Sequence, residues 1–383
     1  MRDAEPGEPT RRPIVIVSNR GPVSFSLDEQ GNLTSRRGAG GLVSGVGPLV
    51  AGTDATWIAA AISEGDRVAA GRGVHAAEGF NVATLALDPD DFRMAYDVVC
   101  NAGLWFVHHE LFDRARRPRF DVAWREAWDA YRRVNEAFAD AVIEGAPPDA
   151  AVLVQDYHLT LLAERVRKAR PDLRLTHFSH TPFAGPDGLH VLPDECVAEL
   201  LAGMAAHDAC GFHTRRWADA FLASCRDVDL EPPSVFVSPL ATSADDIRSV
   251  AADPRTRDEL AALDARVDGR RVIARVDRIE LSKNLLRGFH AFEDLLERYP
   301  AWREQVVFCA FCYLPRGLAE YLAYRQEVEG LVQRINDRWA TPGWTPILFD
   351  QTDNFRCRSP PCAATTSSWS TPSATGSTSS PRA

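Results

Sequence analysis

The chain has no long hydrophobic run. Its 383 residues contain no stretch of about 18 apolar residues, the length that a membrane-spanning helix needs. The first residues, MRDAEPGEPTRRP, are polar and lack the hydrophobic segment of an export signal. We therefore expect a cytoplasmic protein with no membrane partner.

The sequence also lacks an excess of basic residues. Its 43 Lys and Arg residues are outnumbered by 53 Asp and Glu residues, which gives a formal net charge of −10. Proteins that bind nucleic acids usually carry a basic face, so this balance argues against a nucleic-acid partner. A local basic pocket for a small anion is still compatible with it.

Paired cysteines with metal-ligand spacing are missing as well. The eight cysteines are scattered, and the C-x-x-C pair formed by Cys309 and Cys312 has no second pair to accompany it. This pair lies in VVFCAFCY, an apolar run typical of a buried strand. We expect core thiols here, and neither a metal nor another cofactor.

What the sequence does contain is an α/β pattern. Its composition, with 45% hydrophobic and 25% charged residues, is that of a soluble globular protein. Apolar residues recur every three or four positions from residue 122 to 143, which predicts an amphipathic helix. Short, nearly continuous apolar segments alternate with such helices, as in parallel sheets buried on both faces. These segments are PIVIVSNR, AVLVQDYH, LRLTHFSH, SVFVSPL, RVIARVD and QVVFCAF.

Two parallel sheets are predicted, one ending near PLATSADD and one beginning near RRVIARVD. The expected domains cover residues 1–245 and 246–355, and a tail follows at 356–383. Ligands of open α/β sheets bind at the carboxyl ends of the strands. Polar residues follow several predicted strands, so we expect an enzyme cleft there; they are Ser18 to Arg20, Asp156 to His158, His180 and Arg278.

A glycine-rich stretch, RRGAGGLVSGVGPL, runs from Arg36 to Leu49. Gly38, Gly40 and Gly41 would let backbone N–H groups approach an anion at a helix N-terminus. No Lys-Ser/Thr pair follows, so the stretch is not a P-loop. Phosphate or sugar binding and a tight structural turn are both open.

A second candidate for anion binding is VDRIELSKN, where a predicted strand enters a helix. Arg278 and Lys283 lie five residues apart across this turn. A guanidinium and an ammonium beside a helix N-terminus favour a pyrophosphate site. A pair of solvated basic side chains is the alternative.

Three further positions have two interpretations each. Asp156 could accept hydrogen bonds from sugar hydroxyls or act as a helix N-cap. His180 ends a predicted strand, although a lone histidine is more often structural. Tyr96 and Trp105 could form a wall on which a sugar stacks, or could pack in the core.

Taken together, these stretches resemble trehalose-6-phosphate synthases, over residues 14 to 355. The resemblance implies the GT-B architecture, two facing Rossmann-like α/β domains with parallel sheets. The motifs that carry it occur in the family's order: VSNRGPVSF, RRGAGGLVSG, NAGLWFVHHELFD, VLVQDYHL, HFSHTPF, GFHTRRWADAFL, RVDRIELSKNLLRGF and RINDRWATPGWTP.

The resemblance implies transfer of glucose from UDP-glucose, or another nucleotide-glucose, to glucose 6-phosphate, with retention. It also implies a role for each site residue. Gly40 and Gly41 would cover the donor phosphates, Asp156 would bind acceptor hydroxyls, and His180 would lie near the donor sugar. Arg278 and Lys283 would neutralise the leaving diphosphate without a metal. The acceptor and its phosphate would be held by Arg20, Tyr96, Trp105 and Arg316.

Two departures from the family pattern leave the acceptor open. WIAAAIS replaces a W-x-G-W type stretch, and PLATS replaces P-x-G-x-D. Related synthases use glycerol 3-phosphate or cyclitol acceptors. An alternative of another class is a non-catalytic remnant that binds a sugar phosphate. The oligomeric state is also open, with a homo-oligomer among the alternatives.

Residues 356–383 differ from everything before them, because they contain no Asp, Glu, Leu, Ile or Val. If one base is restored after the Phe355 codon, G/C-rich synonymous codons yield PLSVAALRRYDVLLVNPVRDGLNLVAKG. This reads as a helix, a strand and the D-G-x-N-L-V loop with which the family continues. We hypothesise a shifted reading frame, which would leave the second domain incomplete and the activity negligible; a disordered linker is the alternative.

Overall fold

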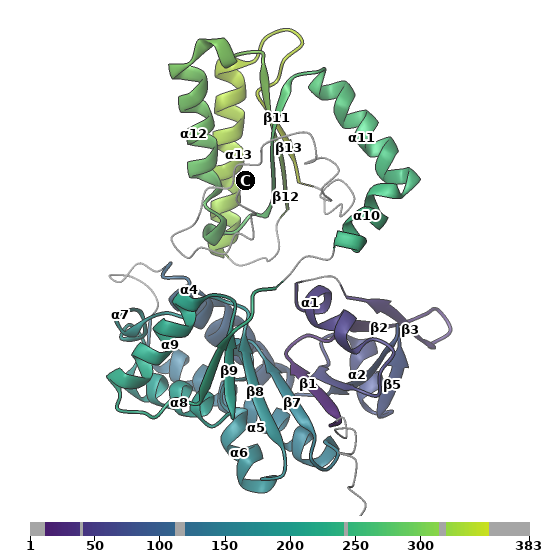
Figure 1. Cartoon of the computed structure of the whole chain (residues 1–383), viewed down its shortest axis with the longest axis vertical. Coiled ribbons are helices and arrows are strands. Elements are labelled where there is room, and N and C mark those ends of the chain that lie inside the picture. Colours follow the sequence, from purple (N-terminus) through teal and green to yellow (C-terminus); the bar gives the residue numbers. More distant parts are fainter. Residues whose placement is uncertain (1–11, 39–40, 112–118, 241–243, 314–318, 352–383) are drawn as a thin grey trace, which may run out of the picture. The chain divides into compact units, whose positions relative to one another are not determined.

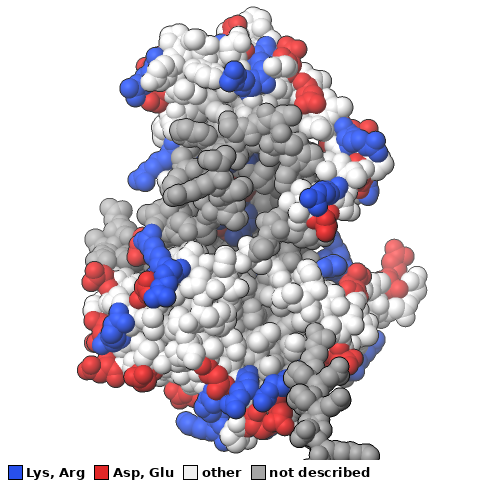
Figure 2. Space-filling view, viewed as in Figure 1, with Lys and Arg blue, Asp and Glu red and all other residues white. Residues whose placement is uncertain are grey.

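The structure is a computed structural model, and it describes residues 12–38, 41–111, 119–240, 244–313 and 319–351, except the side chains of Ser44 and Asp246. The chain divides into two compact units, residues 1–241 and 242–383 (Figure 1). Within the described residues, no helix is both long and apolar enough to cross a membrane. On the face seen in Figure 2, acidic and basic side chains are interspersed over each unit.

Unit 1 is built on an eight-stranded sheet in the order β10-β9-β8-β7-β1-β4-β6-β5. Strand β5 pairs antiparallel with β6, and the other neighbours are parallel. The central strand β1 is almost inaccessible to solvent, with Val15, Ile16 and Val17 at most 1% exposed, as its apolar run predicts. The strands are β1 (Ile14–Ser18), β4 (Thr56–Ala60), β5 (Val74–Ala77), β6 (Phe80–Leu85), β7 (Ala151–Gln155), β8 (Arg174–Ser179), β9 (Ala209–Phe212) and β10 (Ser234–Val237).

A two-stranded hairpin, β2 (Val23–Leu27) and β3 (Leu33–Arg37), follows β1. Asp66, buried at the start of α2, accepts hydrogen bonds from the backbone N–H groups of Phe25 and Ser63 and so ties the hairpin to this helix. The longer helices of unit 1 are α1 (Gly41–Val50), α2 (Glu64–Ala70), α5 (Val122–Gly145), α6 (Leu162–Ala169), α8 (Asp194–Ala205) and α9 (Arg215–Asp227).

Helix α5 confirms the helix predicted over residues 122–143. Asp121 caps its N-terminus by accepting from the backbone N–H of Trp124. Its buried stripe includes Trp128, Tyr131 and Phe138. The Tyr131 hydroxyl donates to the Tyr157 carbonyl at 2.8 Å, which fixes the segment that leaves β7.

Unit 2 contains a three-stranded parallel sheet in the order β11-β12-β13. Its strands are β11 (Arg271–Arg278), β12 (Val306–Tyr313) and β13 (Ile347–Asp350), and its helices are α10 (Ala244–Ala252), α11 (Pro254–Val267), α12 (Leu285–Arg298) and α13 (Ala319–Trp339). Helices α12 and α13 lie side by side on one face of the sheet (Figure 1). Cys309 and Cys312 are fully buried in β12, which confirms that they are core thiols.

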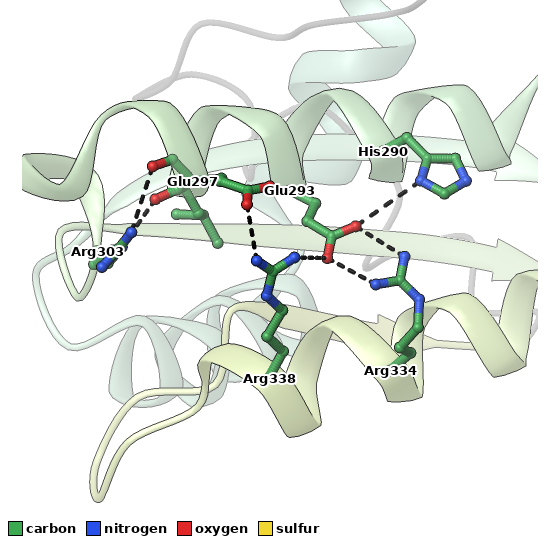
Figure 3. A network of polar contacts seen from close by, with 7 residues as sticks. His290, Glu293, Glu297, Arg303, Arg334 and Arg338 are labelled. Carbon is green, nitrogen blue, oxygen red and sulfur yellow. Dashed lines mark hydrogen bonds and ion pairs between the residues drawn. The ribbon is translucent and has the colours of Figure 1, made fainter.

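A charged network joins α12 to α13 (Figure 3). Glu293, only 7% exposed, accepts two hydrogen bonds from Arg334 and one from Arg338. Arg303 and Arg338 both stack on the Trp339 ring, at 4.4 and 4.6 Å from its centroid. These contacts hold the two helices in register over the sheet.

Candidate active site

Asp156 is the first residue after strand β7, and its backbone is strained. Its φ of 69° and ψ of 169° fall in a region that is essentially reserved for glycine. Strain of this kind costs roughly 1–3 kcal/mol and is concentrated at functional sites. The carboxylate makes no capping bond to the short helix that follows, Tyr157–Leu159, which rules out the N-cap interpretation. It accepts instead from the backbone N–H groups of His180 and Thr181, at 3.2 and 3.3 Å.

His180 is the first residue after strand β8, the neighbour of β7. Its Nε2 lies 2.9 Å from the side-chain oxygen of Gln155. Burial, followed by the nearby His213, lowers the pKa of His180 from 6.5 to about 4. The ring is therefore neutral at pH 7.

Arg20, Tyr96 and His158 form a column of stacked side chains near the carboxyl ends of strands β1 and β7. The Arg20 guanidinium, which follows β1, lies 5.7 Å from the centroid of the Tyr96 ring. Tyr96 in turn stacks on His158, with centroids 5.7 Å apart and planes inclined by 21°. The structure thus brings Arg20 and Tyr96 together, as required of residues that would share one ligand.

Tyr96 and Trp105 lie on one continuous helical segment, the first part of which is a π-helix. Residues Met94–Leu104 form a π-helix, which continues into α4 (Trp105–His108). The i→i+5 hydrogen bonds of a π-helix give it more residues per turn than an α-helix, so side chains nine residues apart have a different angle between them about the helix axis. In an α-helix the same spacing would place them on opposite sides. Trp105 is 4% exposed and stacks on His109 at 4.0 Å.

The glycines of the stretch from Arg36 to Leu49 differ in their surroundings. Gly38 makes a tight turn: its N–H donates to the Pro22 carbonyl at 2.7 Å, and an added Cβ would lie only 3.2 Å from that oxygen. Gly41 opens helix α1 and has free space where a Cβ would be. Gly40 lies outside the described residues. The turn interpretation therefore holds for Gly38, while phosphate binding by Gly40 and Gly41 stays a prediction.

In unit 2, Arg278 ends strand β11 and Lys283 ends the short 3-10 helix Leu281–Lys283. The Nε of Arg278 lies 3.3 Å from Oε1 of Glu280, which is 1% exposed. The Lys283 carbonyl accepts from the buried Arg275 guanidinium, which also donates to Asp277 at 3.0 Å. The Arg278 guanidinium is thus paired with Glu280, and the backbone of Lys283 is fixed just before α12 begins. Arg316 lies outside the described residues.

The first N–H groups of α12 have a partner that the sequence did not suggest. The N–H groups of Leu285 and Leu286 lie 2.7 and 3.4 Å from the Tyr324 hydroxyl, which comes from α13. The helix N-terminus beside Lys283 is therefore capped by a side chain. Arg275, Glu280 and Tyr324 were all missed: Tyr324 makes its contact across some 40 residues, and no local pattern marks the burial of Arg275 and Glu280.

No group of three or more His, Cys, Asp or Glu side chains could hold a metal ion within the described residues.

Two α/β units with parallel sheets, each with polar and basic residues at strand ends, define an enzyme of the GT-B class. The chain belongs to glycosyltransferase family 20, whose family model matches residues 12–356.

The chain is similar to enzymes named α,α-trehalose-phosphate synthase (UDP-forming). It is 30% identical over 358 residues to that of Schizosaccharomyces pombe, covering 88% of this chain and 68% of the relative. The Yarrowia lipolytica enzyme is 31% identical, with 88% and 74% covered. For synthase A of Dictyostelium discoideum, 30% identical, the match spans 89% of this chain and about half of the relative, 47%.

Solved structures show the same likeness. The Burkholderia vietnamiensis α,α-trehalose-phosphate synthase superposes with a TM-score of 0.79 at 27% identity, covering 94% of this chain and 78% of that one. The Burkholderia xenovorans enzyme in complex with glucose-6-phosphate gives 0.78 at 27% identity, with 94% and 79% covered. An E. coli structure with bound UDP-2-fluoro glucose gives 0.76 at 26% identity, with 90% and 75% covered.

Proposed function

We propose that this protein is built to transfer glucose from UDP-glucose to glucose 6-phosphate, with retention, giving α,α-trehalose 6-phosphate. Membership of glycosyltransferase family 20 and the similarity to UDP-forming synthases support this reaction. The observation that carries it is the strained Asp156 beside the neutral His180 at one sheet edge. Such strain persists where surrounding structure holds a residue for function.

The basic residues at strand ends fit the charges of this reaction. The departing diphosphate needs positive charge that is already in place, and Arg278 with Lys283 would supply it. Arg20, with Arg316 beyond the described residues, would bind the acceptor phosphate through paired N–H donors. Tyr96 and Trp105 would flank the acceptor sugar, and Gly40 and Gly41 would cover the donor phosphates.

At the reacting carbon, retention follows from departure and attack on the same face. The bond from C1 of the donor glucose to the diphosphate oxygen breaks as the acceptor hydroxyl oxygen forms a new bond to C1. The acceptor proton passes to the departing phosphate oxygen, so no protein carboxylate needs to form a covalent intermediate. Asp156 would orient the acceptor hydroxyls and His180 the donor sugar, which lowers the entropic cost of this arrangement.

Residues 356–383, for which we hypothesise a shifted reading frame, lie outside the described residues. As part of the proposal, the chain in its present frame would show little turnover, and the frame-restored chain would be active. Sequencing the DNA around the Phe355 codon tests the shift directly: a gene with no missing base would refute it. A cytoplasmic location and a homo-oligomer stay predictions.

The test of function is release of UDP by both chains with UDP-glucose and either glucose 6-phosphate or glycerol 3-phosphate. We expect the frame-restored chain to prefer glucose 6-phosphate, and NMR of the product to show an α,α linkage. Asp156→Asn should abolish transfer, while Asp54→Asn, at an exposed position of unit 1, should not. Equal or greater activity with glycerol 3-phosphate, or none with any acceptor, would contradict the proposal. GDP- and ADP-glucose in the same assay identify the donor base.

A further inference from the structure

Glu280 lies between Arg278 and Lys283 in the sequence and contacts both of them. Its Oε1 is 3.3 Å from Nε of Arg278, and its backbone carbonyl accepts a hydrogen bond from the N–H of Lys283 at 3.0 Å. Its own N–H donates to the carbonyl of Arg278 at 2.8 Å. One residue therefore connects the two cations that are predicted to neutralise a leaving diphosphate.

The carboxylate of Glu280 is unfavourable to bury. It is only 1% exposed, and an ionised carboxylate loses its hydration when it is taken out of water. Hydrogen bonds compensate little for this loss. Oε1 has no hydrogen-bond partner within the described residues, and the Ser282 hydroxyl donates to Oε2 only at 3.5 Å. The Arg278 guanidinium is therefore the main group that compensates the buried charge.

Stability does not account for this carboxylate, because a buried ion pair is often no more stabilising than apolar side chains of similar size. A buried polar group with incomplete hydrogen bonding is instead typical of a site where function reduces stability. The Arg278 side chain, by contrast, is 42% exposed. Its guanidinium is thus held from the buried side by Glu280 and stays accessible to a ligand.

We propose that Glu280 is a positioning residue, whose buried carboxylate fixes the Arg278 guanidinium before a diphosphate binds. The inference rests on the proposed function, in which Arg278 and Lys283 neutralise the diphosphate of UDP-glucose. An arginine loses rotamer freedom when a ligand orders its side chain, and this loss is smaller if the protein has already ordered it. Glu280 therefore strengthens the binding of an anion, although its own charge repels that anion.

Glu280→Gln separates positioning from electrostatics, because it keeps the size of the side chain and removes its charge. Charge repulsion alone predicts that a diphosphate binds this variant more tightly. Positioning predicts weaker binding, since only the ligand then orders Arg278. In calorimetric titrations of the present and frame-restored chains with UDP and UDP-glucose, we expect Glu280→Gln to raise the Kd about three- to tenfold. Glu304→Gln, at an exposed position of unit 2, is the matched control and should leave the Kd unchanged.

The effect of Glu280 should act through Arg278. Arg278→Met should weaken binding, and adding Glu280→Gln to it should change the Kd no further. A Kd of Glu280→Gln equal to or below that of the wild type would overturn the inference and leave the proposed function intact. Losses that simply add in the double variant would do the same. If neither wild-type chain binds UDP or UDP-glucose, or if Arg278→Met binds like the wild type, the diphosphate role of Arg278 falls and the inference falls with it.

The order of the Arg278 side chain can also be measured without a ligand. Relaxation of the arginine ¹⁵Nε groups, with Arg278→Lys to assign the resonance, reports the motion of each guanidinium. We expect the Nε–H of Arg278 to be nearly as ordered as the backbone in the wild type and mobile in Glu280→Gln. A wild-type Nε–H as mobile as those of exposed arginines would overturn the inference, even if Glu280→Gln or Arg278→Met failed to fold.

Discussion

Unit 1 should lose stability on mild acidification, because it buries histidines that are neutral in the folded state. His108 and His207 are 2% and 3% exposed, and burial lowers the pKa of each from 6.5 to about 4. A proton therefore binds the unfolded chain more tightly than the folded one. Their contribution to stability is complete above about pH 6.5, the unfolded value, and is lost as the pH falls towards 4.

The size of the loss follows from the two pKa values. At pH 5 an unfolded histidine with a pKa of 6.5 is almost fully protonated, while one with a pKa of about 4 is mostly neutral. Linkage then gives a loss of about 2 kcal/mol for each group between pH 8 and pH 5, or about 4 kcal/mol for the pair. His177, which is fully buried and has no hydrogen-bond partner on either ring nitrogen within the described residues, is shifted in the same direction and adds to this loss. Losses of this size are a large part of the roughly 5–15 kcal/mol that stabilises a typical domain.

Urea unfolding followed by tryptophan fluorescence, at pH 8 and pH 5, measures the difference. The double variant His108→Gln/His207→Gln should show a pH dependence smaller by about 4 kcal/mol, whatever its absolute stability. His190→Gln, at an exposed site, provides a comparison in which no buried histidine is removed. Nine of the ten histidines precede residue 241, so the transition of unit 2 should respond less. A wild-type free energy of unfolding that is equal at both pH values would refute the reasoning, and so would a double variant that keeps the full pH dependence.

Three further predictions concern single side chains, each measured as a free energy of unfolding. Asp156→Gly should be more stable than Asp156→Ala by about 1–2 kcal/mol, because only glycine relieves the strained backbone; equal stabilities would contradict the strain. Glu293→Gln should cost about 2 kcal/mol, because it weakens the network between α12 and α13. Glu297→Gln, at a more exposed position of the same network, should cost less than about 1 kcal/mol. If Glu297→Gln cost more than Glu293→Gln, the result would be inconsistent with this network. Tyr324→Phe should cost about 1 kcal/mol, since the N–H of Leu285 loses its partner, and no measurable change would exclude that capping role.

The strands that the sequence predicted are those with continuous apolar runs. IVIVS and AVLVQ lie at the centre of the unit 1 sheet, where both faces are covered, so all of their side chains before the last residue are apolar. Strand β9, with the sequence ACGF, was missed because it is short and contains glycine, and the hairpin β2–β3 because its strands are largely polar and exposed. Pairing with neighbours, rather than local preference, makes these segments strands.

The π-helix was missed for a related reason. MAYDVVCNAGL has the composition of an ordinary helix, and no residue in it requires a wider turn. Its packing is tight: Gly103 lies against Trp124 of α5, and a Cβ there would be 2.6 Å from the indole ring. The relation between Tyr96 and Trp105 thus depends on packing that sequence periodicity does not reveal.

By itself, the sequence determined the α/β class, the division into two sheets and the family. Apolar runs, helical periodicity and ordered motifs are properties of short segments, so they can be recognised without the fold. It also identified Asp156, His180 and Arg278 as polar residues at strand ends, and Lys283 in the turn after Arg278. Only the tertiary structure decided how these groups are held. The hydrogen bonds that hold Asp156 and the cap from Tyr324 each come from a group far away in the chain. Hydrogen bonds and burial act through space, so they fix the chemistry of a side chain only after folding has brought its neighbours to it.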